Sequence, residues 1–156
     1  MNRLILILVP MIAILDQISK YLISRYLYVN ESVEVVRKFF HLTLVHNTGA
    51  AFGILRDQTA LFILISVLAV VSILFYLRKR KNLSLAKSTG FGLILAGSLS
   101  NLIDRLRFGY VIDFLDFRIW PVFNIADSAI TIGAILLIIS LLFKKRYTIY
   151  DIRNTK

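Results

Sequence analysis

The sequence predicts an all-α integral membrane protein with four transmembrane helices and a small extracytoplasmic β element. Two observations support this fold class. Of the 156 residues, 58% are hydrophobic and the mean hydropathy is +0.75, which is more apolar surface than a water-soluble domain of this size can bury. The apolar residues also form four runs, each close to the roughly 20 residues that a helix needs to cross a bilayer. We expect residues 1–156 to form a single membrane domain.

The four expected helices cover residues 4–23, 60–77, 85–103 and 126–143. Glycine and proline within these runs do not exclude helices, because in lipid a helix satisfies the backbone polar groups. The first run could instead be a signal peptide, since Arg3 precedes its apolar centre. No small-residue cleavage signature follows it, so we expect it to be retained as the first transmembrane helix.

Basic residues set the expected orientation. More than half of the 19 Lys and Arg residues lie near the N-terminus, between the second and third helices, or after the fourth helix. Short segments rich in Lys and Arg stay on the cytoplasmic side, so both termini should face the cytoplasm. Anionic lipid head groups then account for the formal net charge of +10, and we expect no nucleic-acid partner.

The β element should lie in the first outer connection, residues 24–59. Side chains alternate from Phe40 to Val45 at the period of a half-buried strand. His41 and His46 fall in the same segment, and residues five apart on a regular strand point to opposite faces. Because the chain also has no cysteine, we expect neither a metal site nor another cofactor.

Polar side chains gather at the outer ends of the expected helices and in the outer connections. Asp16 and Lys20 are spaced i,i+4 on the first helix, so they share a face and could simply neutralise each other. Asn101 and Arg105 have the same spacing. Charges inside a membrane are functional in many proteins, so structural and functional roles both stay open. The candidate site residues are Asp16, Lys20, Asn47, Asn101, Asp104, Arg105, Asp113, Asn124 and Asp127.

Two carboxylates of this set have different surroundings. Asp113 lies in the apolar stretch V-I-D-F-L, where desolvation raises a carboxyl pKa. Asp127 follows Asn124 by three residues, which is the spacing of a capping box at the start of the fourth helix. Asp127 could therefore be only a helix cap. Alternatively, two carboxyls brought together in different environments are typical of an acid and a base that activate water.

No competing catalytic motif is present: the sequence lacks G-x-S-x-G, H-E-x-x-H, a P-loop and G-x-G-x-x-G. The nucleophile should therefore be water.

Asp116, three residues after Asp113, would point to the opposite face of an extended segment. Gly92, Ala96 and Ser100 recur every four residues, a stripe that either packs helices together or leaves room for a substrate. A non-enzymatic multipass protein, either a transporter or a scaffold, is the alternative class.

Five motifs follow one another along the chain: D-Q-I-S-K, H-N-T-G-A-A-F, S-N-L-I-D-R, V-I-D-F-L-D and F-N-I-A-D-S. In order and spacing they resemble the motifs of the lipoprotein signal peptidase family, also called signal peptidase II. One difference is Ser100, where the family commonly has glycine. The resemblance implies an aspartic endopeptidase of the bacterial plasma membrane, active at its extracytoplasmic surface, which cleaves prolipoproteins before a diacylglyceryl-modified cysteine without a metal or cofactor.

The resemblance also implies roles for the candidate residues. Asp113 and Asp127 would be the catalytic pair, acting on lipid-modified prolipoproteins in contact with membrane lipid. The residues that would hold substrate or shape the site are Asn47, Asn101, Arg105 and Asn124, supported by Asp16, Lys20 and Asp104.

Overall fold

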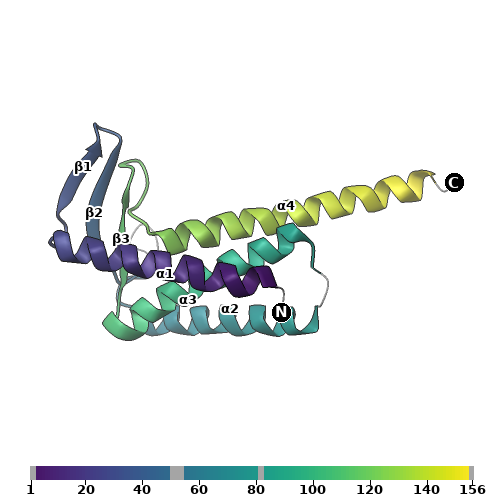
Figure 1. Cartoon of the computed structure of the whole chain (residues 1–156), viewed down its shortest axis with the longest axis horizontal. Coiled ribbons are helices and arrows are strands. Elements are labelled where there is room, and N and C mark those ends of the chain that lie inside the picture. Colours follow the sequence, from purple (N-terminus) through teal and green to yellow (C-terminus); the bar gives the residue numbers. More distant parts are fainter. Residues whose placement is uncertain (1–2, 50–54, 81–82, 155–156) are drawn as a thin grey trace.

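The computed structural model describes residues 3–49, 55–80 and 83–154. Four helices run broadly along one long axis, and a small sheet lies across one end of them (Figure 1). All four predicted helices are present, and each extends beyond its expected range by one or more residues. The helices are α1 (Arg3–Tyr26), α2 (Thr59–Lys79), α3 (Leu85–Phe108) and α4 (Ile125–Asn154), and the strands are β1 (Ser32–Val36), β2 (Phe40–Asn47) and β3 (Val111–Asp116).

Three of the four helices are long and apolar enough to cross a membrane: α1, α2 and, over Ile125–Phe143, α4. Helix α3 is also long, with 24 residues, but it mixes apolar residues with Gly, Ser and charged side chains. Many of its residues between Ser88 and Asp104 are buried against the rest of the protein, and a helix shielded in this way needs less apolar surface. The helical membrane-type fold is confirmed, with three candidate spans among the described residues where four were predicted.

Small residues let α3 approach its neighbours closely. A Cβ added at Gly97 would lie 2.3 Å from the backbone oxygen of Ala126, so the backbones of α3 and α4 are in direct contact there. The stripe of Gly92, Ala96 and Ser100 is buried, and both of its ends contact α1. The stripe therefore packs helices together, as small residues do in membrane bundles.

The sheet draws on the α1–α2 and α3–α4 connections. Its order is β1-β2-β3, and both strand pairs are antiparallel. Strand β2 contains the segment predicted from its alternating pattern, whereas β3 comes from the apolar stretch that leads to α4. Gly109 ends α3 with a φ of 81°, a left-handed conformation that glycine adopts readily, and its N–H donates to the Arg105 carbonyl oxygen at 3.0 Å. This cap turns the chain from α3 into β3.

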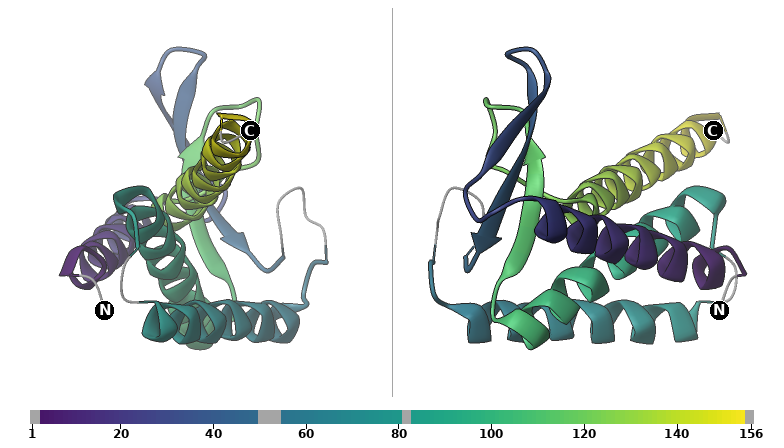
Figure 2. Two further views of the ribbon diagram at one scale, coloured as in Figure 1. Left: turned by 90° about the vertical axis from the view of Figure 1, so that its right-hand side faces the viewer. Right: turned by 60° about the vertical axis from the view of Figure 1, so that its left-hand side comes forward.

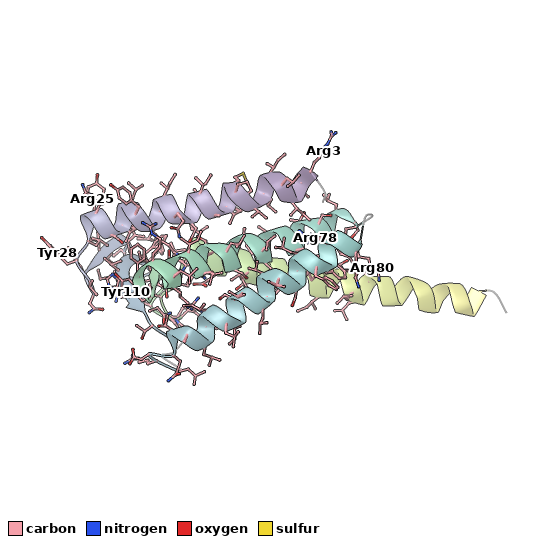
Figure 3. The ribbon with its side chains drawn as sticks, turned by 90° about the horizontal axis from the view of Figure 1, so that it is seen from below. Arg3, Arg25, Tyr28, Arg78, Arg80 and Tyr110 are labelled. Atoms are coloured by element: carbon pink, nitrogen blue, oxygen red, sulfur yellow. The ribbon has the colours of Figure 1, made fainter. Side chains whose placement is uncertain are left out.

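The first turn of α1, the end of α2, the start of α3 and the C-terminal end of α4 all lie at the end of the helices away from the sheet (Figures 1 and 2). Figure 3 shows Arg3, Arg78 and Arg80 at that end, and Tyr28 and Tyr110 at the sheet end. The described parts of the three basic segments, which were predicted to share one side of the membrane, therefore lie at one end of the molecule.

Candidate active site

All nine candidate residues lie at the sheet end of the helices, and hydrogen bonds and ion pairs join every one of them except Arg105. They come from α1, β2, α3, β3 and the start of α4. Three of them, Asn47, Arg105 and Asp127, are half-buried. The others are at most 5% exposed: Asp16, Lys20, Asn101, Asp104, Asp113 and Asn124.

Lys20 is the centre of the part of the site nearest α1. Its ammonium lies 2.7 Å from an oxygen of Asp16 and 2.7 Å from an oxygen of Asp104, and it donates to the Asn101 Oδ1 at 2.9 Å. These three partners match the three donors of an ammonium group. The predicted pair of Asp16 and Lys20 is confirmed, and packing of α1 against α3 adds a second carboxylate to it. The loss of any one partner would leave a buried charge poorly paired.

The two carboxylates around Lys20 also hold backbone groups of other elements. Asp16 accepts the N–H of Ala126 at 2.8 Å, and Asp104 accepts the N–H of Ile112 at 3.2 Å. Each of these backbone positions directly precedes one of the two candidate catalytic aspartates. The buried cluster of Asp16, Lys20 and Asp104 therefore fixes the backbone immediately before each of these two aspartates.

Asn124 joins the two aspartates. Its Nδ2 donates to Asp113 at 2.7 Å, and its Oδ1 accepts the backbone N–H of Asp127 at 2.8 Å. One oxygen of Asp127 accepts the Asn124 backbone N–H at 3.3 Å in return, so the predicted capping box is present. The other oxygen of Asp127 accepts from the amide of Asn101 at 2.8 Å. Asp127 is therefore a helix cap and a member of the polar site at the same time.

Two amide donors hold the carboxylate of Asp113. Asn47 donates to one oxygen at 2.8 Å and Asn124 to the other. The oxygen of the Asn47 side chain accepts the N–H of Gly49 at 2.9 Å, which fixes the end of the amide that faces Asp113. Burial and the charge of Asp127 raise the pKa of Asp113 to about 7, although hydrogen bonds from both asparagines lower it. The two carboxyls therefore hold a proton between them more readily than two exposed carboxyls would.

Both aspartates line a cavity of about 280 Å³, a volume near the lower end of small-molecule binding pockets. Asn47 and Asn101 contribute polar groups to its wall, and residues 120–123, between β3 and α4, form an apolar side. The cavity brings the two carboxylates, amide donors and apolar surface together, which is the arrangement needed to activate water beside an apolar substrate.

Arg105 lines the same cavity without joining the hydrogen-bonded network. Its guanidinium carbon lies 5.1 Å from the centre of the Phe62 ring on α2, within the range of a cation–π interaction. No described carboxylate forms an ion pair with it. Arg105 therefore places a positive charge at the cavity wall.

The two histidines lie outside this site. The prediction that they occupy opposite faces of β2 is wrong, because β2 has an irregular register against β3. Their partners, Asp116 for His41 and Ile112 for His46, are four residues apart and on one face of β3. The two histidines are still about 13 Å apart along the sheet. Within the part of the chain that the structure describes, no group of three or more His, Cys, Asp or Glu residues could hold a metal ion.

Two further polar side chains belong to the network and were not predicted as site residues. Gln17 donates to Asp104 at 2.7 Å and to the Ser100 hydroxyl at 3.1 Å, and Ser100 donates to Asp16 at 2.7 Å. Gln17 is a polar residue inside the apolar helix α1, and this signal could have identified it. Residues 50–52 of the H-N-T-G-A-A-F motif lie outside the described residues.

The fold and the site together define a helical membrane protein with a pair of aspartates on one cavity. The family described as Signal peptidase (SPase) II matches residues 8–143. The chain belongs to this signal peptidase II family, whose members are peptidases. The alternative of a non-enzymatic transporter or scaffold is therefore not supported.

Individual relatives agree with the family assignment. The lipoprotein signal peptidase of Halothermothrix orenii is 49% identical over 138 residues, which cover 88% of this chain and 94% of that protein. The lipoprotein signal peptidase of Moorella thermoacetica is 52% identical over 138 residues, with 85% and 88% covered. A solved structure described as a bacterial membrane enzyme has a TM-score of 0.85 at 36% identity and covers 90% of this chain and 88% of its own.

Proposed function

We propose that this protein is an aspartic endopeptidase that removes the signal peptide from prolipoproteins by cutting before the diacylglyceryl-modified cysteine. The names of the relatives, lipoprotein signal peptidases, support the substrate class. The observation that carries the catalytic assignment is the bridge through Asn124, which binds the side chain of Asp113 and the backbone of Asp127 beside one cavity. We therefore assign Asp113 and Asp127 as the catalytic pair.

In the proposed reaction, the ionised carboxyl of the pair takes a proton from a water molecule as the water oxygen attacks the scissile carbonyl carbon. The protonated carboxyl donates a hydrogen bond to the carbonyl oxygen and polarises it. The C–N bond then breaks, a proton passes to the leaving nitrogen, and the pair again holds one proton in total. The raised pKa of Asp113 favours a pair that keeps this proton at neutral pH and titrates as a unit.

The proposal gives the surrounding residues distinct roles. Three asparagines donate hydrogen bonds to the pair and would orient its oxygens: Asn47, Asn101 and Asn124. Arg105, with its charge at the cavity wall, would bind a backbone carbonyl oxygen of the substrate. The buried cluster behind the pair would keep the catalytic backbone rigid: Asp16, Lys20 and Asp104.

We further propose that all four helices cross the bacterial plasma membrane, with α3 partly shielded from lipid, both termini in the cytoplasm and the site at the extracytoplasmic surface. The basic segments at the end opposite the site support this orientation (Figure 3). The lipid tails and apolar signal segment of the substrate could then stay in the bilayer while the scissile bond reaches the carboxyls.

Topology reporters test this orientation. A reporter after Lys156 or near Asn82, which both lie outside the described residues, should score as cytoplasmic. A reporter near Glu31 should score as extracytoplasmic. The reverse pattern would contradict the proposed placement of the site.

Substitution of each aspartate tests the catalytic assignment. Asp113→Asn and Asp127→Asn should each abolish turnover of a lipid-modified prolipoprotein, measured with purified variants at matched protein level. Each carboxylate accepts hydrogen bonds from two donors, so the variants must also be shown to insert and accumulate.

Glu34→Gln is the matched control, because it removes an exposed carboxylate on β1 that does not line the cavity. This variant should keep wild-type turnover. If Asp127 served only as a cap, its loss of charge would cost about 0.3–1 kcal/mol and leave turnover largely intact. An active Asp127→Asn enzyme would therefore refute the proposed pair.

A further inference from the structure

The pairing between β2 and β3 contains one extra residue on β2. Leu42 pairs with Leu115, and the next register pair is Val45 with Asp113. Two residues of β2 therefore oppose a single residue of β3, which is the arrangement of a β-bulge. Bulges shift the alternation of side chains along a strand and often lie beside active sites.

This bulge decides which face of the sheet Asn47 occupies. On a regular strand, Thr43 and Asn47 would share one face. Across the bulge the alternation shifts by one residue, so Thr43 reaches Asp116 at 2.7 Å while Asn47 reaches Asp113 at 2.8 Å. Asp113 and Asp116 are three residues apart on β3 and point to opposite faces, as predicted. Without the extra residue, Asn47 would lie on the face of Asp116 and away from Asp113.

A closed ring of polar contacts surrounds the bulge on the face opposite Asp113. The Thr43 hydroxyl donates to Asp116, and because its one hydrogen is used there, the Ser32 hydroxyl donates to Thr43 at 2.8 Å. Arg118 donates from its guanidinium to Ser32 at 2.7 Å and from its backbone N–H to Asp116 at 2.8 Å. The ring connects β1 and β2 to the C-terminal end of β3.

Asp116 is the most deeply buried member of the ring, at 5% exposed. Burial raises the pKa of Asp116, but hydrogen bonds from Thr43 and from the Arg118 N–H, with the Arg118 charge, bring it below its ordinary value. Asp116 is therefore ionised at neutral pH, and an ionised acceptor forms a stronger hydrogen bond than a neutral one. No member of the ring lines the cavity, so the ring has no direct part in the proposed chemistry.

We propose that Thr43 and Asp116 are positioning residues whose hydrogen bond holds the β2 bulge in register and so keeps Asn47 on the face of Asp113. The importance of Asn47 for catalysis rests on the proposed function, whereas the effect on strand register does not. Two readouts, one of register and one of activity, therefore test the two parts separately.

Disulfide cross-linking reports the register directly, because the chain has no cysteine of its own. The bulged register pairs Ile112 with His46, whereas a regular register would pair it with Val45. In the full-length membrane protein, His46→Cys/Ile112→Cys should cross-link readily under mild oxidation. Val45→Cys/Ile112→Cys should cross-link slowly, because Val45 points to the other face in the bulged register.

Thr43→Val is the test variant, because it keeps the branched shape and removes the hydroxyl. It should raise the cross-linking rate of the Val45/Ile112 pair about tenfold or more, since a hydrogen bond to a charged group changes an equilibrium by a factor of that size. Thr43→Ser restores the hydroxyl and should return the rate to its original value. Glu34→Gln, outside the ring, should leave it unchanged. Equal rates in Thr43→Val and its parent would overturn the proposal.

The pH profile of activity is the second readout. The bond from Asn47 lowers the pKa of Asp113, so its loss should move the alkaline limb of activity to higher pH in Thr43→Val, as in Asn47→Ala. A merely stabilising role of Thr43 would reduce the amount of active enzyme and leave the limb unmoved. A changed cross-linking pattern with an unmoved limb would support the register proposal and contradict the assignment of Asp113 to catalysis.

Discussion

Replacement of Asp113 by asparagine should make the stability of the protein less dependent on pH. In the wild-type protein, burial and then the charge of Asp127 raise the pKa of Asp113 from 3.8 to about 7. A carboxyl whose pKa is higher in the folded than in the unfolded state binds its proton more tightly in the folded state. The Asp113 carboxyl therefore adds to the free energy of unfolding, and this contribution is complete below pH ~4. It is lost as the pH rises toward about 7. Asparagine does not ionise, so the variant lacks this loss.

The size of the effect follows from the pKa difference. The rise in the pKa of Asp113 from 3.8 to about 7 corresponds to about 4 kcal/mol in total. Between pH ~5 and pH ~8, linkage predicts that the wild-type free energy of unfolding falls by about 2–3 kcal/mol through this group. Asp113→Asn also loses stability in a way that does not depend on pH. The hydrogens of its new amide face the N–H donor of Asn47 or Asn124, so one hydrogen bond is lost. This loss costs about 1–3 kcal/mol. That penalty cancels when one variant is compared at two pH values.

Denaturant unfolding in detergent micelles at pH ~5 and ~8, at constant ionic strength, measures the difference. Wild type should lose about 2–3 kcal/mol more than Asp113→Asn between the two conditions. An equal loss in both proteins would refute the raised pKa of Asp113.

The alkaline limb of activity should lie near pH 7, because the pair must keep one proton. Asn47→Ala should move this limb to higher pH. Profiles of kcat/KM against pH for the wild-type enzyme and the variant test both expectations. Activity should survive chelation, since aspartic chemistry activates water without a metal. Activity lost with EDTA and restored by one divalent ion would contradict the mechanism. Gly97→Ala should destabilise the protein by about 1–3 kcal/mol, because its Cβ would lie 2.3 Å from a backbone oxygen of α4. The Cβ of Gly92→Ala would meet only the end of a flexible side chain at 3.0 Å, so this variant should be nearly neutral. Thermal unfolding of both glycine variants measures the difference.

The helices could be predicted from the sequence because each carries its own signal in length and hydropathy. Helix α3 is where this signal weakens, since its small and polar residues reflect burial against neighbouring helices more than contact with lipid. The length of α4 was underestimated for a related reason. Its helix continues past Phe143 to Asn154, where the residues are no longer apolar and hydropathy gives no information on helicity.

The site was predictable as a set of residues and less so as a network. Spacing along one helix identified the pair of Asp16 and Lys20 and the capping box of Asn124 and Asp127. The bond from Lys20 to Asp104 depends on how α1 packs against α3, which spacing within one helix does not report. The bulge in β2 is a further case, since the alternation of apolar and polar residues contains no mark of an extra residue and gives the wrong face for every position after it.

Several groups in the site have a structural and a chemical role through the same atoms. Asn124 caps α4 with its oxygen and donates to Asp113 with its nitrogen, so its replacement weakens the fold and the proposed chemistry together. Loss of activity alone does not distinguish the two effects. Asn124 is neutral at every pH, so its capping contribution is constant, whereas its bond to Asp113 favours the ionised carboxylate. A shift in the pH dependence of an Asn124 variant would therefore report the bond to Asp113 and not the cap.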